Sequence, residues 1–503
     1  MGGFFKIPLL GSILANLGAM ALLLGVAGCA SVEQSHRHDL GSALADVRDC
    51  AKLFDRYDAA VEEAGVGDTA AYRIAGFPYL RIDRFLASFR AEAGGDGKVF
   101  AAWLGRLQDL AARSRRYELA NLPAASSLKA WGDQNAVAAT LDQCADRLAS
   151  ADVASPDRRE TLLHAEAPDE YSGLARALGF YPLTRIPFYA GVSRWQRDTL
   201  ERFRQARPEA AAETLRYGLA GGGTLDPTAI QALFTQSSVD ALGIPQFNPE
   251  ALAKLFQSFA PVYEIETSGD FDRIGSLVWQ GDASPTVQPS RPTVYRRLAF
   301  TRYHGQVLPQ LVYTVWFSER PSSGRFDLLS GRLDGLVFRV TLDGTGRPLV
   351  YDSIHPCGCY HLFFPTDRVR ALPAPGMNEE WAFIPKSAPE LGGSQRLALR
   401  VASHTHYLVD LRPDSGGGGV DYWFADDDDL RSLPDARPGA TRSAFDADGI
   451  VPGTGRAERF LFWPMGIANS GAMRQWGRHA TAFVGRRHFD DADLIEKRFA
   501  IRP

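Results

Sequence analysis

The sequence has no strong excess of charge of either sign. Its 55 lysines and arginines nearly balance 59 aspartates and glutamates, and the formal net charge of −4 includes no long block of like charge. Nucleic-acid binding depends on a concentrated positive surface, so the composition indicates no nucleic-acid partner. The chain also shows no internal repeat, and no motif in it indicates a nucleotide cofactor.

Long apolar runs are absent except at the N-terminus. After Lys6, an apolar run covers residues 7–28 and ends in Val26-Ala27-Gly28-Cys29. A weakly positive start, an apolar middle and small residues at the end are the three parts of a secretory signal. The run is also long enough to span a bilayer, so a retained transmembrane anchor is an alternative.

The four residues that end at Cys29 resemble a bacterial lipobox. This resemblance to lipoprotein precursors covers residues 1–29 only. It implies that residues 1–28 are a signal peptide and that Cys29 is acylated, with chains such as palmitate anchoring the protein to a membrane. Ala30 stands where inner-membrane lipoproteins carry aspartate, so the resemblance favours the outer membrane, facing the periplasm. The alternative is an ordinary signal peptide with a chance cysteine.

The rest of the chain has an ordinary globular composition. Hydrophobic residues make up 45% of the sequence and charged residues 23%, so the mature chain can bury a sizeable core. Its length is sufficient for two or three domains. Residues 29–39 are mainly polar and predict a tether between the lipid and the fold.

Apolar residues recur at steps of three and four in the N-terminal half, as is typical of amphipathic helices. The stripes comprise Leu40, Ala43, Leu44, Val47, Cys50, Ala51, Phe54, Tyr57 and Val61, then Val99, Phe100, Trp103, Leu104, Leu107 and Leu110, and then Val137, Leu141, Cys144 and Leu148. We therefore expect a helical domain over residues 40–219. Pro182 and Pro187 are expected to interrupt the helical pattern before another helix near residues 196–206.

Cysteine is scarce, with five residues in the chain, and one of them is the expected lipidation site. Cys50 and Cys144 each lie on the apolar stripe of a predicted helix, so facing helices would bring them together. In an oxidising compartment, we favour a disulfide between them over two small buried thiols. Closing so long a loop would stabilise the fold by up to about 4 to 5 kcal/mol in the chain-entropy model.

The pattern changes from helices to strands in the C-terminal half. Residues 220–261 predict a linker with connecting helices, one of them starting at Asn248-Pro249. Residues 262–503 predict a β-rich domain with hairpins at 293–317 and 336–354 and further strands at 396–410 and 459–463. The predicted fold class is α+β, with an N-terminal helical bundle followed by a mainly antiparallel β-rich domain.

The strongest chemical signal is a cluster of metal donors within seven residues, at the end of the second hairpin. Pro356 and Gly358 predict a bent loop there, which would bring some of these donors together. The segment 404–406 is expected to complete the site, because alternate residues of a strand project the same way. The candidate ligands are His355, Cys357, Cys359, His361, His404 and His406. Mixed imidazole and thiolate donors suit zinc or copper.

Two other interpretations of this loop stay open. In the first, Cys357 and Cys359 form a strained redox-active disulfide with each other or are small buried residues beneath aromatic side chains. In the catalytic interpretation, Cys359 is the nucleophile, His404 or His361 takes its proton and Asp410 orients the imidazole.

The segment 456–488 mixes arginine and histidine with aromatic residues. Guanidinium groups beside aromatic faces bind anionic or sugar-like ligands. The simpler interpretation is a surface whose arginines pair with Glu458, Asp490, Asp491 and Asp493.

The sequence thus predicts a lipid-anchored cell-envelope protein whose β-rich domain carries a Cys/His metal or redox centre. A periplasmic cysteine-dependent hydrolase or acyl transferase is one alternative, and a non-catalytic envelope scaffold is another. The metal hypothesis requires that segments 355–361 and 404–406 converge in space.

Overall fold

The computed structural model describes residues 45–502, apart from residues 127, 129–131, 206–212, 222, 282–283 and 377–378. The expected signal segment, the lipidation site Cys29 and the tether lie outside the described residues. In the described part of the chain, no helix is both long enough and apolar enough to cross a bilayer.

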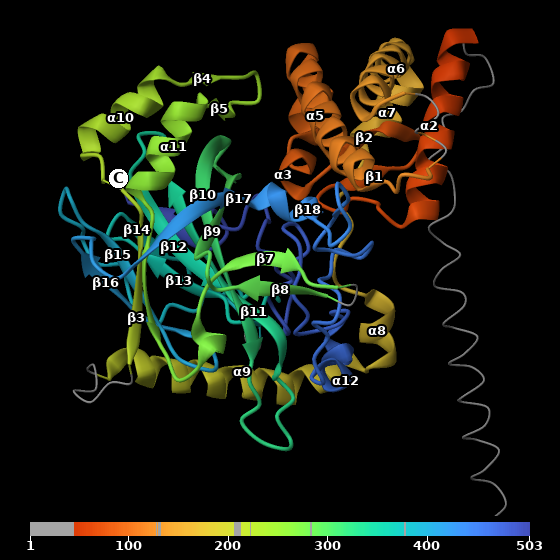
Figure 1. The fold of residues 1–503 in the computed structure, drawn as a ribbon. Coiled ribbons are helices and arrows are strands. Elements are labelled where there is room, and N and C mark those ends of the chain that lie inside the picture. Colours follow the sequence, from red (N-terminus) through yellow and green to blue (C-terminus); the bar gives the residue numbers. More distant parts are fainter. Residues whose placement is uncertain are drawn as a thin grey trace, which may run out of the picture.

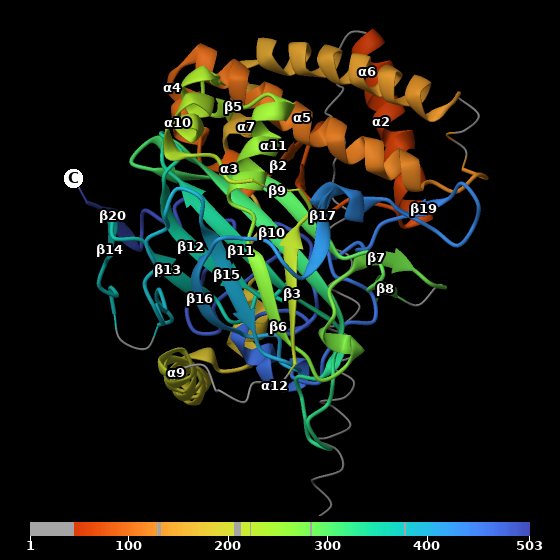
Figure 2. The same cartoon turned by 60° about the vertical axis from the view of Figure 1, so that its left-hand side comes forward.

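A curled ten-stranded sheet forms the centre of the molecule (Figures 1 and 2). In spatial order its strands are β13 (Leu362–Pro365), β12 (Pro348–Ile354), β11 (Gly331–Leu342), β10 (Gln306–Arg320), β9 (Thr293–Tyr303), β17 (Val420–Asp426), β3 (Thr214–Leu219), β6 (Val262–Glu266), β15 (Arg396–Val401) and β16 (Leu408–Asp414). Neighbours are antiparallel except at β9–β17, β17–β3 and β6–β15. The fold is therefore mixed α and β, as predicted.

The two predicted hairpins are confirmed. β9 pairs with β10 around His304 and Gly305, and β11 pairs with β12 around residues 343–347. β10 and β11 are buried along most of their length, which agrees with their almost continuous apolar sequences.

The prediction of one strand at 396–410 is wrong, because the chain turns back between β15 and β16. His404 and His406 occupy this turn with φ of 63° and 50°. Backbone in this left-handed region cannot continue a strand. The expected alternation of the two imidazoles along one strand face is therefore lost.

Helices gather above the sheet in the N-terminal part of the chain (Figure 1). They are α2 (Ala45–Ala64), α3 (Arg84–Ala87), α4 (Arg90–Gly95), α5 (Gly97–Asn121), α6 (Gln134–Ala154) and α7 (Pro156–Leu163). A simple helical bundle is not confirmed, because the hairpin of β1 (Tyr72–Ile74) and β2 (Phe77–Ile82) lies among these helices. Phe77, Tyr79 and Leu80 of β2 are fully buried in the same core as α2, α5 and α6.

Ion pairs between buried side chains join this helical layer to the C-terminal half. Arg431 binds Asp68 at 2.7 Å, and Arg84 binds Asp490 at 3.1 Å. The hydroxyl of Tyr171 also donates to the carbonyl of Ala482 at 2.8 Å. The two halves of the chain therefore form one packed body.

The boundaries predicted at 219 and 262 differ from those of the structure. β3 already belongs to the central sheet, because Tyr217 is buried against its neighbours in the sheet core. The intervening segment forms α10 (Pro227–Gln236), the short hairpin of β4 (Ser238–Val239) and β5 (Pro245–Gln246), and α11 (Pro249–Ser258). The predicted start of α11 is confirmed, since the Asn248 side chain accepts from the N–H of Ala251.

A long helix crosses the lower edge of the sheet in the view of Figure 1. It is α9 (Tyr181–Arg204), preceded by α8 (Gly173–Leu178). Pro182 and Pro187 do not interrupt it, because Pro182 lies in the first turn and Pro187 removes a single backbone hydrogen bond. Thr199 is the one buried residue among those described in α9.

The C-terminal residues are mostly loops that pack under the sheet. Residues 459–463 form α12 (Arg459–Phe462) and the start of the 3-10 helix η4 (Trp463–Met465) instead of the predicted strand. The remaining short elements are η2 (Asp270–Asp272), β7 (Ser276–Trp279), β8 (Pro285–Gln288), β14 (Val369–Ala371), η3 (Asp427–Arg431), β18 (Leu433–Pro434), β19 (Thr441–Arg442) and β20 (Phe499–Ile501).

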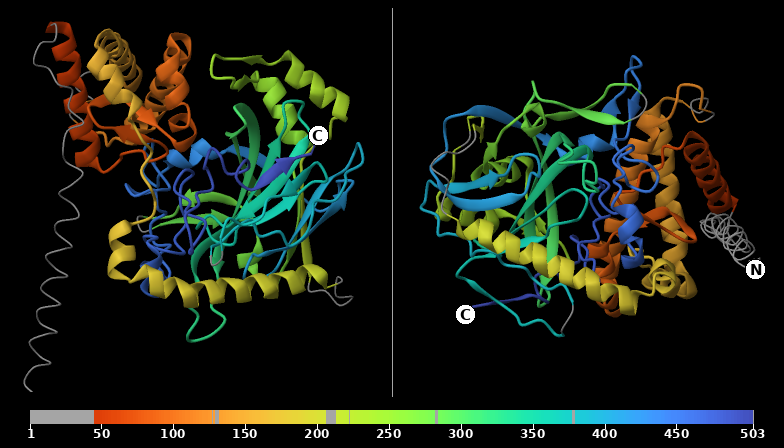
Figure 3. Two further views of the ribbon diagram at one scale, coloured as in Figure 1. Left: turned by 180° about the vertical axis from the view of Figure 1, so that it is seen from behind. Right: turned by 90° about the horizontal axis from the view of Figure 1, so that it is seen from below.

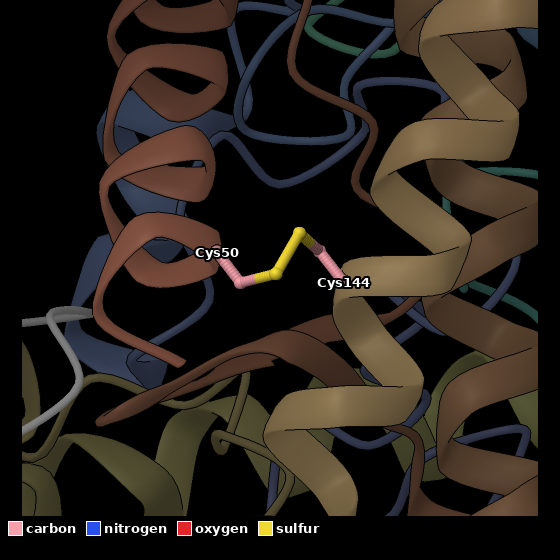
Figure 4. The surroundings of a disulfide bond; sticks show 2 residues. All are labelled: Cys50 and Cys144. Atoms are coloured by element: carbon pink, nitrogen blue, oxygen red, sulfur yellow. A yellow bond between two sulfur atoms is a disulfide. The ribbon is translucent and has the colours of Figure 1, made fainter. Parts of the chain in front are cut away.

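Cys50 of α2 and Cys144 of α6 face each other with their sulfur atoms 2.02 Å apart (Figure 4). This is the pairing that the two helical stripes predict. The bond closes a loop across 94 positions of the chain and ties the outermost helix of the layer to its neighbour.

We predict that Cys50→Ala/Cys144→Ala lowers the free energy of unfolding by up to about 4 kcal/mol, because the unfolded chain regains the entropy of a long loop. Urea denaturation measures the change. Dithiothreitol should destabilise the wild-type chain by the same amount and leave the double variant unaffected. Equal stability of the two proteins under oxidising conditions would contradict the prediction.

Candidate functional site

The chain bends sharply in the loop 355–361 at the end of β12. The N–H of His355 donates to the carbonyl of Cys359 at 3.0 Å, and that of Gly358 donates to the carbonyl of His355 at 2.8 Å. Gly358 has φ of 90°, and a Cβ there would lie 2.4 Å from the carbonyl oxygen of Ala480. Only glycine fits this position. The loop is bent, as Pro356 and Gly358 predict.

The bend brings the thiols of Cys357 and Cys359 together. They are hydrogen-bonded to each other, and the N–H of Cys359 also donates to the sulfur of Cys357. Cys357 is 3% exposed, whereas Cys359 is half-buried. The described loop therefore presents two neighbouring thiols, of which one is accessible.

Electrostatics favour a single negative charge on this pair. Burial opposes ionisation of Cys357, but the hydrogen bond from Cys359 and the positive charge of Arg456 outweigh it and lower its pKa. The same thiol–thiol hydrogen bond, together with burial, raises the pKa of Cys359. The pair thus releases one proton much more readily than two.

A mostly apolar cavity of about 550 Å³ opens beside the thiols. Its lining includes Phe188, Gly191, Val192 and Trp195 of α9 and Leu461 and Phe462 of α12. Cys357, Gly358 and Cys359 also contribute to its wall. The volume suits a small organic ligand, and polar side chains such as His361, Glu458 and Arg487 line it together with the thiols.

Glu458 lines this cavity, and its carboxylate interacts electrostatically with both thiols. It is 3% exposed, and its charge raises the pKa of both cysteines. Burial raises the pKa of Glu458 itself to about 7, although Arg456 and Arg320 oppose this. At neutral pH, the carboxyl group can therefore both give and take a proton.

A buried carboxylate joins the two segments that the sequence predicted to converge. Asp334 of β11 lies 3.1 Å from Nδ1 of His355 and 3.0 Å from Nδ1 of His406. Arg456 approaches the same carboxylate at 3.5 Å. Next to them, the rings of Tyr360 and Tyr407 are 4.5 Å apart. Segments 355–361 and 404–406 therefore do meet, at His355 and His406.

The charges of this network balance. Burial disfavours the charge of Asp334, but His355, Arg456 and the hydrogen bond from His406 outweigh it and hold its pKa well below the usual range. Hydrogen bonds to Asp272 and Asp334 overcome burial and raise the pKa of His406. Burial dominates at His355 and lowers its pKa. The negative charges of Asp272 and Asp334 are then balanced by the positive charges of His406 and Arg456.

The other two histidines point elsewhere. Nε2 of His361 lies 2.9 Å from Asp352, and the ring stacks on Phe363. His404 lies on the outside of the turn, where its Nδ1 faces Ser403 at 2.8 Å and Ser268 at 3.1 Å. Across the described ranges, no three His, Cys, Asp or Glu side chains are arranged to hold a metal ion.

No family model, curated protein or solved structure matches the chain. The chemistry of the site therefore follows from its own geometry.

The three residues of the expected catalytic set have separate partners. Cys359 pairs with Cys357, His404 faces two serines, and Asp410 binds Lys386 at 2.9 Å. No described contact joins them into a relay.

The arginines of segment 456–488 are mostly structural. Arg456, Arg474 and Arg487 are nearly fully buried and donate to backbone carbonyls. Their partners are mainly carbonyls, so neither interpretation describes these three, whereas Arg478 and Arg486 pair with the acidic Glu170 and Asp169. Arg456 and Arg474 do contribute positive charge near the thiols.

Sequence reasoning missed Asp334, Glu458 as a cavity residue, and α9 as a cavity wall. A signal existed for Asp334, because a lone carboxylate within the apolar run of β11 must find a buried partner. No sequence signal marks Glu458 or α9, since both become part of the cavity only through long-range packing.

We predict that Gly358→Ala lowers the free energy of unfolding by about 3 kcal/mol or more, because the residue has positive φ and no room for a Cβ. Gly305→Ala is a matched control, since Gly305 has φ of 80° but nothing within 4 Å of its Cβ position. That change should cost only about 1 kcal/mol. Equal losses in urea denaturation would show that the contact with Ala480 is unimportant.

We predict that Glu458→Gln stabilises the protein at pH 8 but not at pH 4. The folded pKa of about 7 lies above the ordinary 4.5, so the folded state binds the extra proton and the wild type loses stability as the pH rises between these values. The gain for the variant should approach about 3 kcal/mol above pH 7. Urea denaturation at several pH values tests this, with the exposed Glu390→Gln as a control that should show no such trend.

Proposed function

We propose that the protein is a lipid-anchored cell-envelope protein whose Cys357–Cys359 pair performs thiol–disulfide chemistry on a small apolar sulfur compound. The observation that carries this proposal is the placement of two hydrogen-bonded thiols in the wall of a mostly apolar cavity. Attachment to the envelope follows from the lipobox resemblance at Cys29, and the outer membrane facing the periplasm from Ala30.

The different exposure of the two thiols supports separate roles. Cys359 is the accessible member and takes the role of attacking group, while the buried Cys357 takes the role of resolving group. A proton moving from Cys359 to Cys357 along their hydrogen bond places the negative charge on the attacking sulfur. Arg456 and Arg474 stabilise that charge.

The proposed reaction exchanges one disulfide for another. Cys359 bonds to one sulfur of the substrate disulfide, and the other sulfur leaves as a thiolate that takes a proton through Glu458. Cys357 then attacks the sulfur of Cys359, which releases the second substrate thiol. Two protein thiols and one substrate disulfide thus become one protein disulfide and two substrate thiols, and the reverse reaction uses the same atoms.

The cavity supports an apolar substrate. Its aromatic and aliphatic lining favours an uncharged organic group beside the sulfur. Gly191 of α9 faces this space without a side chain, and nothing lies within 4 Å of its Cβ position. A large side chain at position 191 would fill part of the substrate volume.

We predict that the purified chain exchanges thiols with an aromatic disulfide, forming a disulfide between Cys357 and Cys359 that mass spectrometry detects as the loss of two hydrogens. Its reduction potential should lie above about −300 mV, since a disulfide between cysteines only two positions apart closes a small, strained ring. Cys359→Ser should abolish the reaction, and Cys357→Ser should trap a mixed disulfide at Cys359. Gly191→Trp should slow the reaction with the aromatic disulfide about tenfold, while Ala190→Trp, at an exposed neighbouring position that does not line the cavity, should leave the rate unchanged.

Failure of the reduced chain to exchange, with both thiols intact, would contradict the proposal. If the chain neither exchanges thiols nor binds a metal, the non-catalytic envelope scaffold is the interpretation that is left. Release of a carboxylic acid from an ester substrate, dependent on Cys359, would favour a hydrolase or acyl transferase instead.

A zinc or copper centre is the second candidate. The observation that favours it is Nδ1 of His361, which lines the same cavity and has no hydrogen-bond partner among the described residues. Its Nε2 is bonded to Asp352, as is usual for a metal-bound imidazole. Metal analysis of the same preparation distinguishes the candidates, because one zinc or copper per chain, lost in His361→Ala, would replace the redox proposal.

A further inference from the structure

Exposed hydrophobic side chains are unevenly distributed over the molecule. Ten of the fourteen large hydrophobic side chains exposed in the described part of the chain lie in three segments. Five belong to α8 and α9, namely Leu174, Leu178, Phe180, Leu183 and Ile186. The other five are Phe326 and Leu328 in the loop between β10 and β11, and Phe460, Leu461 and Trp463 at α12 and η4. We call these ten side chains the apolar face.

The three segments are packed against one another. Gly179, after α8, lies so close to Pro464 that a Cβ would approach it to 2.5 Å. The rings of Phe188 and Phe462 are 5.3 Å apart, which joins α9 to α12. The N–H of Glu458 donates to the carbonyl of Leu328 at 3.1 Å, which joins α12 to the β10–β11 loop. The view from below shows α8, α9, α12 and this loop on one side of the molecule (Figure 3).

The exposure of these side chains exceeds that of ordinary surface hydrophobics. Phe326 is 88% exposed, Phe460 72% and Phe180 70%. Single exposed hydrophobics are common, but a contiguous group of ten marks a surface that contacts another apolar phase or molecule. The phenylalanines and Trp463 are the residue types that favour the interfacial region of a bilayer.

The charges among these segments are mainly positive. α8 and α9 carry six arginines, the β10–β11 loop carries Arg325 and α12 carries Arg459, whereas the acidic residues there that are not buried are Asp198, Glu201 and Asp327. A positively charged rim around an apolar face is complementary to anionic lipid headgroups above acyl chains.

We propose that the apolar face docks onto an anionic lipid bilayer, with its aromatic and aliphatic side chains inserted among the acyl chains. The expected lipid anchor keeps the chain near a bilayer, since the fifteen residues 30–44 between Cys29 and α2 span at most about 50 Å when extended. The lipid then holds the protein at the membrane, and the apolar face sets its orientation. Leu461 belongs to both the apolar face and the wall of the cavity, so docking turns the cavity toward the membrane.

This inference goes beyond the proposed thiol chemistry and does not depend on it. The test uses the full chain reconstituted on vesicles of phosphatidylethanolamine and phosphatidylglycerol that carry brominated acyl chains. Bromine quenches tryptophan fluorescence at acyl-chain depth. The contribution of Trp463 is obtained as the difference from Trp463→Phe. Trp423, 57% exposed on β17, serves as a reference through Trp423→Phe.

We expect the Trp463 contribution to fall by at least half on brominated vesicles and the Trp423 contribution to stay unchanged. Phe180→Ser/Leu183→Ser/Phe460→Ser should abolish the quenching of Trp463. Val239→Ser/Val420→Ser removes exposed hydrophobics elsewhere and should leave it intact. Phosphatidylcholine alone should weaken the quenching severalfold. Circular dichroism and alkylation of Cys359 check that each variant is folded.

Three outcomes would overturn the proposal. The first is an unquenched Trp463 in protein that remains bound to the vesicles. The second is equal quenching in the triple serine variant. The third is a dimer in sedimentation that disappears in that variant, because a second copy of the chain would then cover the face. Thiol exchange is measured in parallel, and its loss or retention reports on the redox proposal alone.

Discussion

The carboxylate of Asp334 is the contact on which the geometry of the site depends. It draws together the start of β11, the end of β12, the turn between β15 and β16, and Arg456 of the C-terminal loops. All of these groups are buried, so each charge is stable only while its partners are present. Removing one partner of such a pair typically costs about 3 to 5 kcal/mol, because the remaining charge is left without compensation. The network therefore holds together segments that are far apart in the chain, and the loss of one partner destabilises the whole network.

The thiols in the loop 355–361 depend on the same network of charges. Arg456 serves two purposes, since it balances Asp334 and lowers the pKa of Cys357. Gly358 lets the loop bend under the backbone of Ala480, and this bend places the two sulfurs side by side. Glu458 is buried beside the mostly apolar cavity, and this burial raises its pKa to about 7. The hydrogen bond from Cys359 and the charge of Arg456 thus favour a thiolate despite burial, whereas burial itself gives a carboxyl group that titrates near neutrality.

The position of α9 relates the cavity to the molecular surface. The helix contributes cavity-lining residues such as Val192 and Trp195, while its first turns carry the exposed Leu183 and Ile186. One helix therefore separates the apolar interior of the cavity from the apolar face. A membrane-bound orientation would give apolar molecules a short path from the acyl-chain region to the thiols. Contacts with residues of α12 and η4 hold this helix in place.

The sequence by itself determined the features that depend on short-range patterns. The helical stripes around Cys50 and Cys144, the two hairpins, the N-cap at Asn248 and the bend at Gly358 follow from local periodicity and backbone preference, and the structure has each of them. The α9 prolines, the turn at His404 and His406, and α12 were misassigned, because tertiary contacts outweighed weak local preferences. Tertiary structure alone decided that Asp334 receives His355 and His406, that His361 turns to Asp352, and that Glu458 enters the cavity. Those partners lie in different segments of the chain, and the free energy of burying a charge with its counter-charge has no signature in the spacing of residues.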